Sequence, residues 1–463
     1  MLIIQNADIS TGIDNETKTV TIVTDHGKIV SIEDVDFTVP ADAQMIDAKG
    51  CLVLPGAIDP HVHFDTPGYE EREDFAHGTR AAAAGGVTTV IDMPDTCVPT
   101  ITNVDHLKAK NNVIQKMAYV DYALWAGMSA NTLRDDDWQE NMATLWEAGV
   151  VGFKSYLISG MKTFQDLSVM ELGQVMQKAN DLGALVGLHA EDKSIIKART
   201  EELINENKNT LADYYFSRSF PAETEGVITG LGLAKQTGCA LHIVHLGSGK
   251  ALNHIAKQRS LGVNVSAETC PHYLHFTHED FNKKGAYLKT APVVKTAEDR
   301  EALWYGLIDG HIDFLATDHA PCSAKEKEND NAWDAYGGMP GVELLLPYLF
   351  SMGYMKQKLT LEQLINLTST NAAKRFGLFP QKGSLAVGSD ADLVIIDPKN
   401  IWAVHGQDMH SKAKWTCFEG MSLMGKIMKT LVRGLVVYDA DEGIVGEAGY
   451  GNWITRLPLS VDR

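Results

Sequence analysis

The stretch LVLPGAIDPHVHF, residues 52–64, is an apolar run that ends in two histidines. Side chains two positions apart on a β-strand point to the same face, so His61 and His63 present both imidazoles on one side of the strand's end. Two imidazoles placed in this way can bind one metal ion if carboxylates or further histidines complete the site. Taken alone, the pair is equally compatible with two ordinary surface or core histidines.

Seven further short apolar segments follow this stretch, and helical patterns such as residues 72–86 and 166–183 lie between them. The expected strands are 52–60, 87–92, 118–126, 150–154, 184–189, 240–246, 262–267 and 312–317. Strands that alternate regularly with helices favour an α/β fold of the (β/α)8 barrel type over a doubly wound sheet. We therefore predict one barrel over residues 52–380.

The two ends of the chain differ from this middle part in their residue pattern. Residues 1–51 and 381–463 contain short β-branched runs separated by Gly, Asp and Asn, which is typical of strands and turns. A β-rich beginning and a β-rich end around one barrel predict that both ends pair into a single small β-sandwich domain. Residues 1–51 would form its N-terminal part, and residues 381–463 its C-terminal part and a tail.

Composition excludes several classes of partner. The 463 residues include 41 basic and 60 acidic side chains, a net charge of −19 that argues against nucleic acid or an anionic membrane as a partner. The six cysteines are scattered without a CxxC spacing, which indicates reduced thiols. The sequence shows no signal-peptide pattern and no apolar run of membrane-spanning length, so we expect a cytoplasmic protein.

Polar side chains stand at the ends of four other expected strands. Lys154 ends VVGFK, His189 ends ALVGLH, His245 ends LHIVH, and Asp318 directly follows IDFLAT. Active sites of (β/α)8 barrels lie at the C-terminal ends of the strands. Each residue alone could be a hydrogen-bonded core side chain or a helix cap, but together they predict a shared metal site.

Lys154 is the unusual member of this set. An ammonium cannot bind a metal, and its burial without a partner is unfavourable. Reaction of the neutral amine with CO₂ would give a carbamate, an anionic group with two oxygens that can bridge two cations; a salt bridge at the barrel mouth is the alternative. We predict two divalent ions, with His61, His63 and Asp318 on one, and His189 and His245 on the other. The carbamate and a hydroxide would bridge ions about 3.5–4 Å apart and supply a nucleophile near neutral pH.

Eight motifs of the chain resemble those of the cyclic amidohydrolases, the group of dihydroorotases, allantoinases and hydantoinases (dihydropyrimidinases). They are IDPHVHF (58–64), GTRAAAAGGVTTVIDMP (78–94), GFKSYL (152–157), LHAED (188–192), VHLGS (244–248), ETCPHYL (268–274), ATDHAPC (316–322) and GSDADLVIID (388–397). The resemblance extends over essentially the whole chain. It places all six predicted ligands where that family has its metal ligands.

The resemblance implies a barrel with a β-sandwich, a carboxylated Lys154, two metal ions that are usually Zn²⁺, and hydrolysis of a cyclic amide or imide in purine or pyrimidine metabolism. The bridging hydroxide would attack the ring carbonyl, and Asp318 would pass its proton to the departing nitrogen. Backbone groups near Ala291 and Gly337 would recognise the substrate amide. Homodimers or homotetramers are common in the family, so we expect a homo-oligomer.

Departures from each subfamily bear on the substrate, which would be a small cyclic amide. Dihydroorotases typically follow the two histidines with Leu-Arg and carry an Asn in an MPNT segment, and both groups bind the substrate carboxylate. This chain has Asp65 and Asp95 in those places. Two carboxylates would repel a carboxylate substrate, unless Lys162 or Arg218 compensates. Each aspartate could instead cap a turn or brace its loop.

Ser159 occupies the position, five residues after Lys154, where hydantoinases have an oxyanion-binding tyrosine. Allantoinases usually have a small hydroxyl residue there and share the ETCPHYL segment, in which His272 would face the substrate. The sequence therefore favours a substrate with a neutral ring and N–H donors, and allantoin is the first candidate. Asp65 and Asp95 would accept hydrogen bonds from these donors. A dihydroorotase or a hydantoinase remains the alternative, and a non-catalytic scaffold of the same fold is a remote one, because scaffolds of this kind lose metal ligands.

Overall fold

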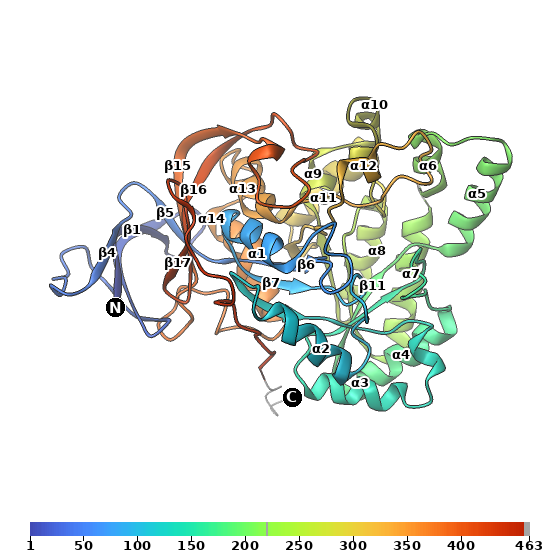
Figure 1. Cartoon of the computed structure of the whole chain (residues 1–463), viewed down its shortest axis with the longest axis horizontal. Coiled ribbons are helices and arrows are strands. Elements are labelled where there is room, and N and C mark those ends of the chain that lie inside the picture. The colour runs from blue at the N-terminus through green and yellow to red at the C-terminus, as the bar shows by residue number, and fades with distance from the viewer. Residues whose placement is uncertain (219–220, 458–463) are drawn as a thin grey trace.

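The structure is a computed structural model that describes residues 1–218 and 221–457. It contains a barrel of parallel strands surrounded by helices, and a sheet domain at one side of this barrel that both ends of the chain build (Figure 1). The last residues of the predicted tail, 458–463, lie outside the described part. The predicted fold class, a (β/α)8 barrel with a small β-sandwich, is confirmed.

The barrel wall consists of two parallel sheets that meet at both edges. The first contains β6 (Ala57–Val62), β7 (Val87–Asp92) and β8 (Asp121–Leu124). The second contains β9 (Ala126–Gly127), β10 (Phe153–Tyr156), β11 (Leu185–His189), β12 (Ala240–Ile243), β13 (Val265–Thr269) and β14 (Phe314–Leu315). Only Trp125 separates β8 from β9, and a parallel bridge between Val62 and His319 joins the opposite edges. The barrel is thereby closed.

The first expected strand, 52–60, is divided between the two domains. Its first half, β5 (Leu52–Pro55), pairs antiparallel with β15 (Leu393–Ala403) in the sheet domain, and its second half is β6 of the barrel. Gly56 lies between them, and a Cβ atom there would lie 2.0 Å from Oγ1 of Thr88. The observed sheet domain thus extends four residues beyond the expected boundary at residue 51, because an apolar run does not show where a chain changes sheets.

The sheet domain is a nine-stranded sheet in the order β18-β17-β16-β15-β5-β1-β2-β3, with β4 paired to β1. Its other strands are β1 (Leu2–Ser10), β2 (Thr17–Asp25), β3 (Lys28–Glu33), β4 (Gln44–Asp47), β16 (Ser422–Val432), β17 (Leu435–Asp439) and β18 (Gly443–Ile444). Ile4 and Ile22 of the N-terminal strands pack in one apolar cluster with Leu393 and Leu431 of the C-terminal strands. The expected pairing of the two chain ends is therefore correct.

Helices cover the outside of the barrel. They are α1 (Phe75–Ala84), α2 (Val104–Ile114), α3 (Trp138–Glu147), α4 (Val169–Leu182), α5 (Lys193–Asn205), α6 (Leu211–Arg218), α7 (Ala222–Thr237), α8 (Gly249–Ser260), α9 (Pro271–His275), α10 (Phe281–Lys284), α11 (Ala297–Ile308), α12 (Ala324–Lys327), α13 (Leu345–Leu349), α14 (Leu361–Ile365) and α15 (Asn371–Arg375). Polar side chains cap several N-termini; Ser168 and Glu171 form a reciprocal capping box at α4. None of the helices in the described residues is long and apolar enough to span a bilayer.

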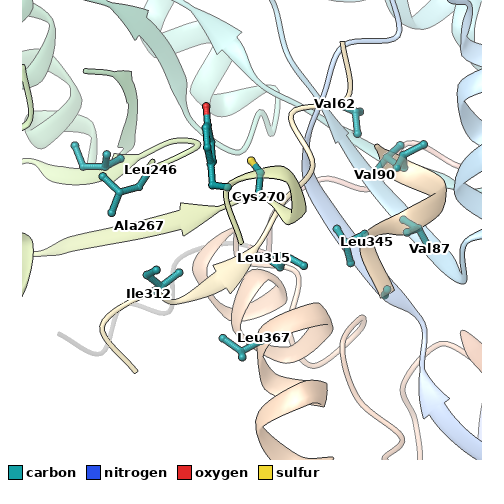
Figure 2. Packing of buried hydrophobic residues seen from close by; sticks show 14 of the residues in the cluster. Val62, Val87, Val90, Leu246, Ala267, Cys270, Ile312, Leu315, Leu345 and Leu367 are labelled. Atoms are coloured by element: carbon teal, nitrogen blue, oxygen red, sulfur yellow. The ribbon is translucent and has the colours of Figure 1, made fainter. Parts of the chain in front are cut away.

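Apolar side chains fill the space between the strands and the helices. Figure 2 shows part of this core, which includes Val87 and Val90 of β7, Leu315 of β14, Leu345 of α13 and Leu367. Burial of this kind contributes about 25 cal/mol for each Å² of apolar surface removed from water. The packed core fixes the strands, so the polar side chains at the strand ends are held on a rigid frame.

Candidate metal centre

Two histidines and one carboxylate meet at the ends of β6 and β14. Asp318 Oδ1 lies 3.3 Å from His61 Nε2 and 3.2 Å from His63 Nε2, and one ligand atom from each of the three residues lies within 4.8 Å of the others. All three side chains are nearly inaccessible to solvent. The two imidazoles point the same way because they are two positions apart on one strand.

A second pair of histidines lies beside this group. His189 Nδ1, at the end of β11, lies 2.9 Å from His245 Nε2, which follows β12. The ring centroids of His61 and His245 are 5.3 Å apart, so the two halves of the predicted site adjoin. The barrel brings together the four histidines and Asp318 that the sequence suggests.

Lys154 on β10 is completely buried, and its Nζ has no hydrogen-bond partner in the described structure. Burial lowers the pKa of this amine, although Asp95, Asp318 and Glu268 act in the opposite direction. A neutral amine is the form that can react with CO₂, and the resulting carbamate would bring negative charge among the histidines. His61 Nε2 is likewise buried without a hydrogen-bond partner. These unpartnered groups and the donor set of imidazoles and carboxylate fit a pair of divalent cations bridged by a carbamate.

Two buried glutamates orient the histidines from behind. Glu268 Oε1 lies 2.5 Å from His61 Nδ1, and Glu191 Oε2 lies 2.8 Å from His189 Nε2. A carboxylate on one ring nitrogen leaves the other nitrogen free as a metal ligand and fixes the ring's orientation. Sequence reasoning did not assign these roles, although both residues lie in the motifs LHAED and ETCPHYL. The available signal for Glu191 was its position two residues after the expected ligand His189, whereas Glu268 has no expected ligand beside it in the sequence.

Asp318 has a left-handed backbone conformation, with φ of +49°, as does His245, with φ of +40°. Such conformations are unfavourable by about 1–3 kcal/mol for residues other than glycine and persist where the surrounding structure imposes them. Although burial alone would raise it, the neighbours His61, His63 and Lys154 lower the pKa of Asp318 to about 2. The carboxylate is therefore ionised and can accept a proton.

A cavity of about 420 Å³ opens over this group at the C-terminal ends of the strands. Its lining includes His63, His189, His245 and Asp318, together with four of the predicted substrate-binding residues, Asp95, Ser159, Ala291 and Gly337. The other two, Asp65 and His272, are buried outside this lining. Burial raises the pKa of Asp65 to about 8 and lowers that of His272 to about 4. Their part in substrate binding stays a prediction.

Asp95 is the acidic residue of the cavity wall on the side of β7. Its Oδ2 accepts a 2.9 Å hydrogen bond from the Tyr156 hydroxyl and lies 3.8 Å from His63 Nδ1. Its Oδ1 is buried without a partner. Sequence reasoning did not include Tyr156 in the site, although it lies two positions after Lys154 and thus on the same face of β10. It lines the cavity, as do Tyr69, Arg72, Arg218 and Tyr336.

Both guanidinium groups in the cavity wall already have carboxylate partners. Arg218 Nη1 lies 2.5 Å from Glu191 Oε2, and Arg72 Nε lies 2.8 Å from Glu326 Oε1. Arg218 counteracts the effect of burial on Glu191 and lowers the pKa of that carboxyl to about 2. A small molecule that enters the cavity would therefore meet the carboxylate of Asp95 but, in the described lining, no guanidinium that lacks a carboxylate partner.

Comparison with known proteins gives one consistent group of relatives. The model of the amidohydrolase family matches residues 52–437. An allantoinase of Rubrobacter xylanophilus is 38% identical over 405 residues, which cover 87% of this chain and 88% of that protein. An allantoinase of Escherichia coli is 33% identical over 449 residues, 96% of each chain.

Solved structures of hydantoinases have the same fold. The L-hydantoinase (dihydropyrimidinase) of Arthrobacter aurescens superimposes with a TM-score of 0.93 at 32% identity, over 98% of this chain and 99% of that one. A D-hydantoinase of a Bacillus species has a TM-score of 0.92 at 30% identity, over 99% of this chain and 100% of the other. The similarity therefore includes the barrel and the sheet domain together.

Proposed function

Because this chain belongs to the amidohydrolase family and is a cyclic amidohydrolase, we propose that it opens the ring of a neutral cyclic ureide, with allantoin as the first candidate. The observation that carries this choice is the acidic wall of the cavity at Asp95, beside the cluster of His61, His63 and Asp318. Similarity to proteins named allantoinases supports the same substrate.

The six ligand residues of this proposal are His61, His63, Lys154 as its carbamate, His189, His245 and Asp318. Two divalent ions, which we propose to be Zn²⁺, would polarise the ring carbonyl and lower the pKa of a water molecule when bound there. Glu268 and Glu191 hold the rings of His61 and His189 in the required orientation. Lys154 lies on β10, the strand next to that of His189, and as its carbamate would supply the anionic ligand for the two ions.

Asp318 performs the proton transfers of the reaction. Its ionised carboxylate accepts the proton of the attacking water and then delivers it to the ring nitrogen that leaves. Backbone groups at Ala291 and Gly337, which line the cavity, would orient the scissile amide, and Ser159 lies in the same lining. The buried walls exclude bulk water around the reacting atoms and so strengthen each of these interactions.

In this proposal, Asp95 determines which cyclic substrate the cavity accepts. A substrate carboxylate would meet the like charge of Asp95 in the cavity wall, whereas the N–H groups of a ureide would be attracted to it. Arg218 lines the cavity but is paired with Glu191, and Lys162 is absent from the cavity lining. The cavity lining therefore does not supply a substrate carboxylate with an unpaired guanidinium from Arg218 or with the ammonium of Lys162, which disfavours dihydroorotate. Assembly into a homodimer or homotetramer and a cytoplasmic location stay predictions.

A comparison of turnover tests this proposal. Protein loaded with zinc and supplied with bicarbonate would be assayed with allantoin, hydantoin and dihydroorotate at equal concentrations. We expect kcat/KM to be highest for allantoin and lowest for dihydroorotate. Preference for hydantoin would mean that the substrate is a neutral ring without the ureido group. Preference for dihydroorotate would contradict the proposed role of Asp95.

A further inference from the structure

The connection between β15 and β16, residues 404–421, extends from the sheet domain to the active-site end of the barrel (Figure 1). We call it the β15–β16 loop. Backbone hydrogen bonds from Val404 to Met421 and from Gly420 to Val404 close its base. Its contacts with the barrel include Ser411 Oγ to Glu73 Oε2 at 2.6 Å, His410 N to Glu343 Oε2 at 2.8 Å and Trp415 Nε1 to the Cys322 carbonyl at 2.8 Å.

Two of these barrel segments, those of Glu73 and Glu343, contact the side chain of His319, the residue after Asp318. The backbone carbonyl of His319 accepts a 2.8 Å hydrogen bond from the backbone of His63, and its backbone also bridges to Met339. Hydrogen bonds also hold the His319 ring. Its Nδ1 accepts hydrogen bonds from the backbone N–H groups of Gly341 at 3.0 Å and Val342 at 3.2 Å. Nε2 therefore carries the ring proton and donates it to Glu73 Oε2 at 3.3 Å.

Glu73 connects this ring to the sheet domain. Its side chain is completely buried, and the oxygen that faces His319 also accepts the Ser411 hydroxyl and the backbone N–H of Lys412. On the other side of the ring, the residue after Val342 is Glu343, which accepts the backbone N–H of His410. The β15–β16 loop thus contacts both structures that hold the His319 ring.

We propose that Ser411, Glu73 and His319 are positioning residues through which the sheet domain holds Asp318 and His63 in place. Asp318 needs such support because its left-handed backbone conformation is unfavourable in itself. His319 is bonded to it covalently and to His63 by a hydrogen bond, so a shift of His319 displaces two ligand residues at once. Nothing in the proposal requires Ser411 or Glu73 to touch the substrate.

This inference rests on the metal site of the proposed function. Loss of an interaction behind a metal ligand lowers metal affinity or activity by about 10–100-fold in other metal sites. We expect Ser411→Ala and Glu73→Gln each to lower kcat by about tenfold with little change in KM, because the substrate contacts remain. Both variants should also lose their metal to a chelator faster than the unaltered protein does.

The test compares these variants with a matched control. Ser389 is a buried serine of the sheet domain whose hydroxyl donates to the Pro380 carbonyl at 2.8 Å, and it does not contact the β15–β16 loop in the described hydrogen bonds. Ser389→Ala therefore reproduces the loss of one buried serine hydrogen bond. For all variants kcat, KM, the rate of metal loss and the unfolding temperature would be measured, and the double variant of Ser411 and Glu73 would be included.

Support requires kcat and metal retention to fall in Ser411→Ala and Glu73→Gln but not in Ser389→Ala at a similar unfolding temperature. The double variant should then lose no more than the worse single variant, because both act through one ring. Equal kcat and equal metal loss in Ser411→Ala, Glu73→Gln and the control would overturn the inference. An unaltered protein without metal or turnover would instead contradict the proposed function itself.

Discussion

In the proposed mechanism Asp318 has two roles, metal ligand and proton carrier, which a single substitution can separate. Its Oδ1 lies near the Nε2 atoms of His61 and His63, and its ionised form would be the base of the proposed reaction. An asparagine at this position keeps an oxygen that can bind a metal but cannot carry a proton between water and the ring nitrogen. Metal binding therefore needs only an oxygen atom at this position, whereas proton transfer needs an ionisable carboxylate.

The Asp318→Asn variant should retain its metal and lose about 10²–10⁴-fold in kcat, the usual contribution of a positioned general acid and base. Metal analysis and steady-state kinetics on the same preparation measure both properties. Turnover within tenfold of the unaltered protein would remove the proton-transfer role from Asp318.

Asp95 and Tyr156 should act together on substrate choice. Asp95→Asn removes the negative charge, so we expect a higher KM for a neutral ureide and a smaller preference over dihydroorotate. Tyr156→Phe removes the hydroxyl that binds Asp95 Oδ2 and should shift KM in the same direction by a smaller factor.

Tyr122→Phe is the matched control for this pair. The Tyr122 hydroxyl donates to Asn111 at 2.7 Å, and the residue is absent from the cavity lining. Kinetics with both substrates would be compared for all three variants. The ratio of kcat/KM for allantoin to kcat/KM for dihydroorotate is the quantity to compare. If this ratio is the same in Asp95→Asn and in Tyr122→Phe, Asp95 does not select the substrate.

That the residues of the candidate site lie together could be predicted from sequence, because local rules place them. Residues at strand ends of a barrel converge, and two positions along a strand return to the same face, which locates His61 and His63. Glu268 and Glu73 could not be assigned in this way, because their roles depend on contacts with His61 and Ser411, which are distant in the chain. Such contacts exist only once the chain has folded.

Among the elements, the loop after β14 contributes Tyr336 and Gly337 to the cavity wall, and two buried lysines bind its backbone. Lys327 Nζ donates to the carbonyls of Lys289 at 3.0 Å and Tyr336 at 2.9 Å, and Lys289 Nζ donates to the carbonyl of Ala335. Neither lysine forms an ion pair in the described residues. Burial lowers the pKa of Lys327 to about 7 and that of Lys289 to about 8. A neutral amine has two N–H donors, which match the two carbonyls that Lys327 contacts.

This arrangement predicts a pH dependence of stability. The unfolded chain keeps the Lys327 proton up to a pH of about 10.4, whereas the folded chain releases it above about 7. The unfolded state therefore binds more protons between these values, so stability should rise with pH over that interval.

Lys327→Met should flatten this rise, because the variant has no proton to release at that position. Urea unfolding at pH 7 and pH 9 measures the effect, and Lys257→Met, at an exposed position on α8, provides the control. An identical change of unfolding midpoint with pH in Lys327→Met and the control would show that Lys327 stays charged in the folded state.

The same distinction between local and distant information applies to the strands. Regular alternation of strand and helix was sufficient for the barrel, and the resemblance of the chain ends to strands was sufficient for their pairing. The division of residues 52–60 at Gly56 was not predictable, because it depends on Thr88 approaching the backbone and on β15 arriving from the other end of the chain. A continuous apolar run has the same appearance in either sheet.

At the scale of the whole molecule, one buried lysine joins the two domains. Lys382 Nζ lies 2.5 Å from Asp121 at the start of β8, and 2.9 Å and 2.7 Å from Asp390 and Asp392 before β15. All four side chains are almost inaccessible, and Arg433 also pairs with Asp121. The ammonium neutralises carboxylates of the barrel and of the sheet domain at once.

Lys382→Met should lower the free energy of unfolding by about 3–5 kcal/mol, because it leaves buried carboxylates without their cation. Lys18→Met, which removes an exposed pair with Asp34, should change stability much less, because water and salt screen exposed charges. Urea unfolding of both variants gives the comparison. A loss in Lys382→Met no larger than in Lys18→Met would mean that the cluster does not hold the domains together.

The proposed function requires that the barrel bind two metal ions with the help of a carboxylated Lys154. Metal content per chain, measured after reconstitution with zinc and bicarbonate in the unaltered protein and in Lys154→Ala, tests this requirement. We predict about two ions per chain in the unaltered protein and at most one in the variant, since the variant lacks the bridge between the histidine pairs. Two ions retained in folded Lys154→Ala, or fewer than two in the unaltered protein, would contradict the account.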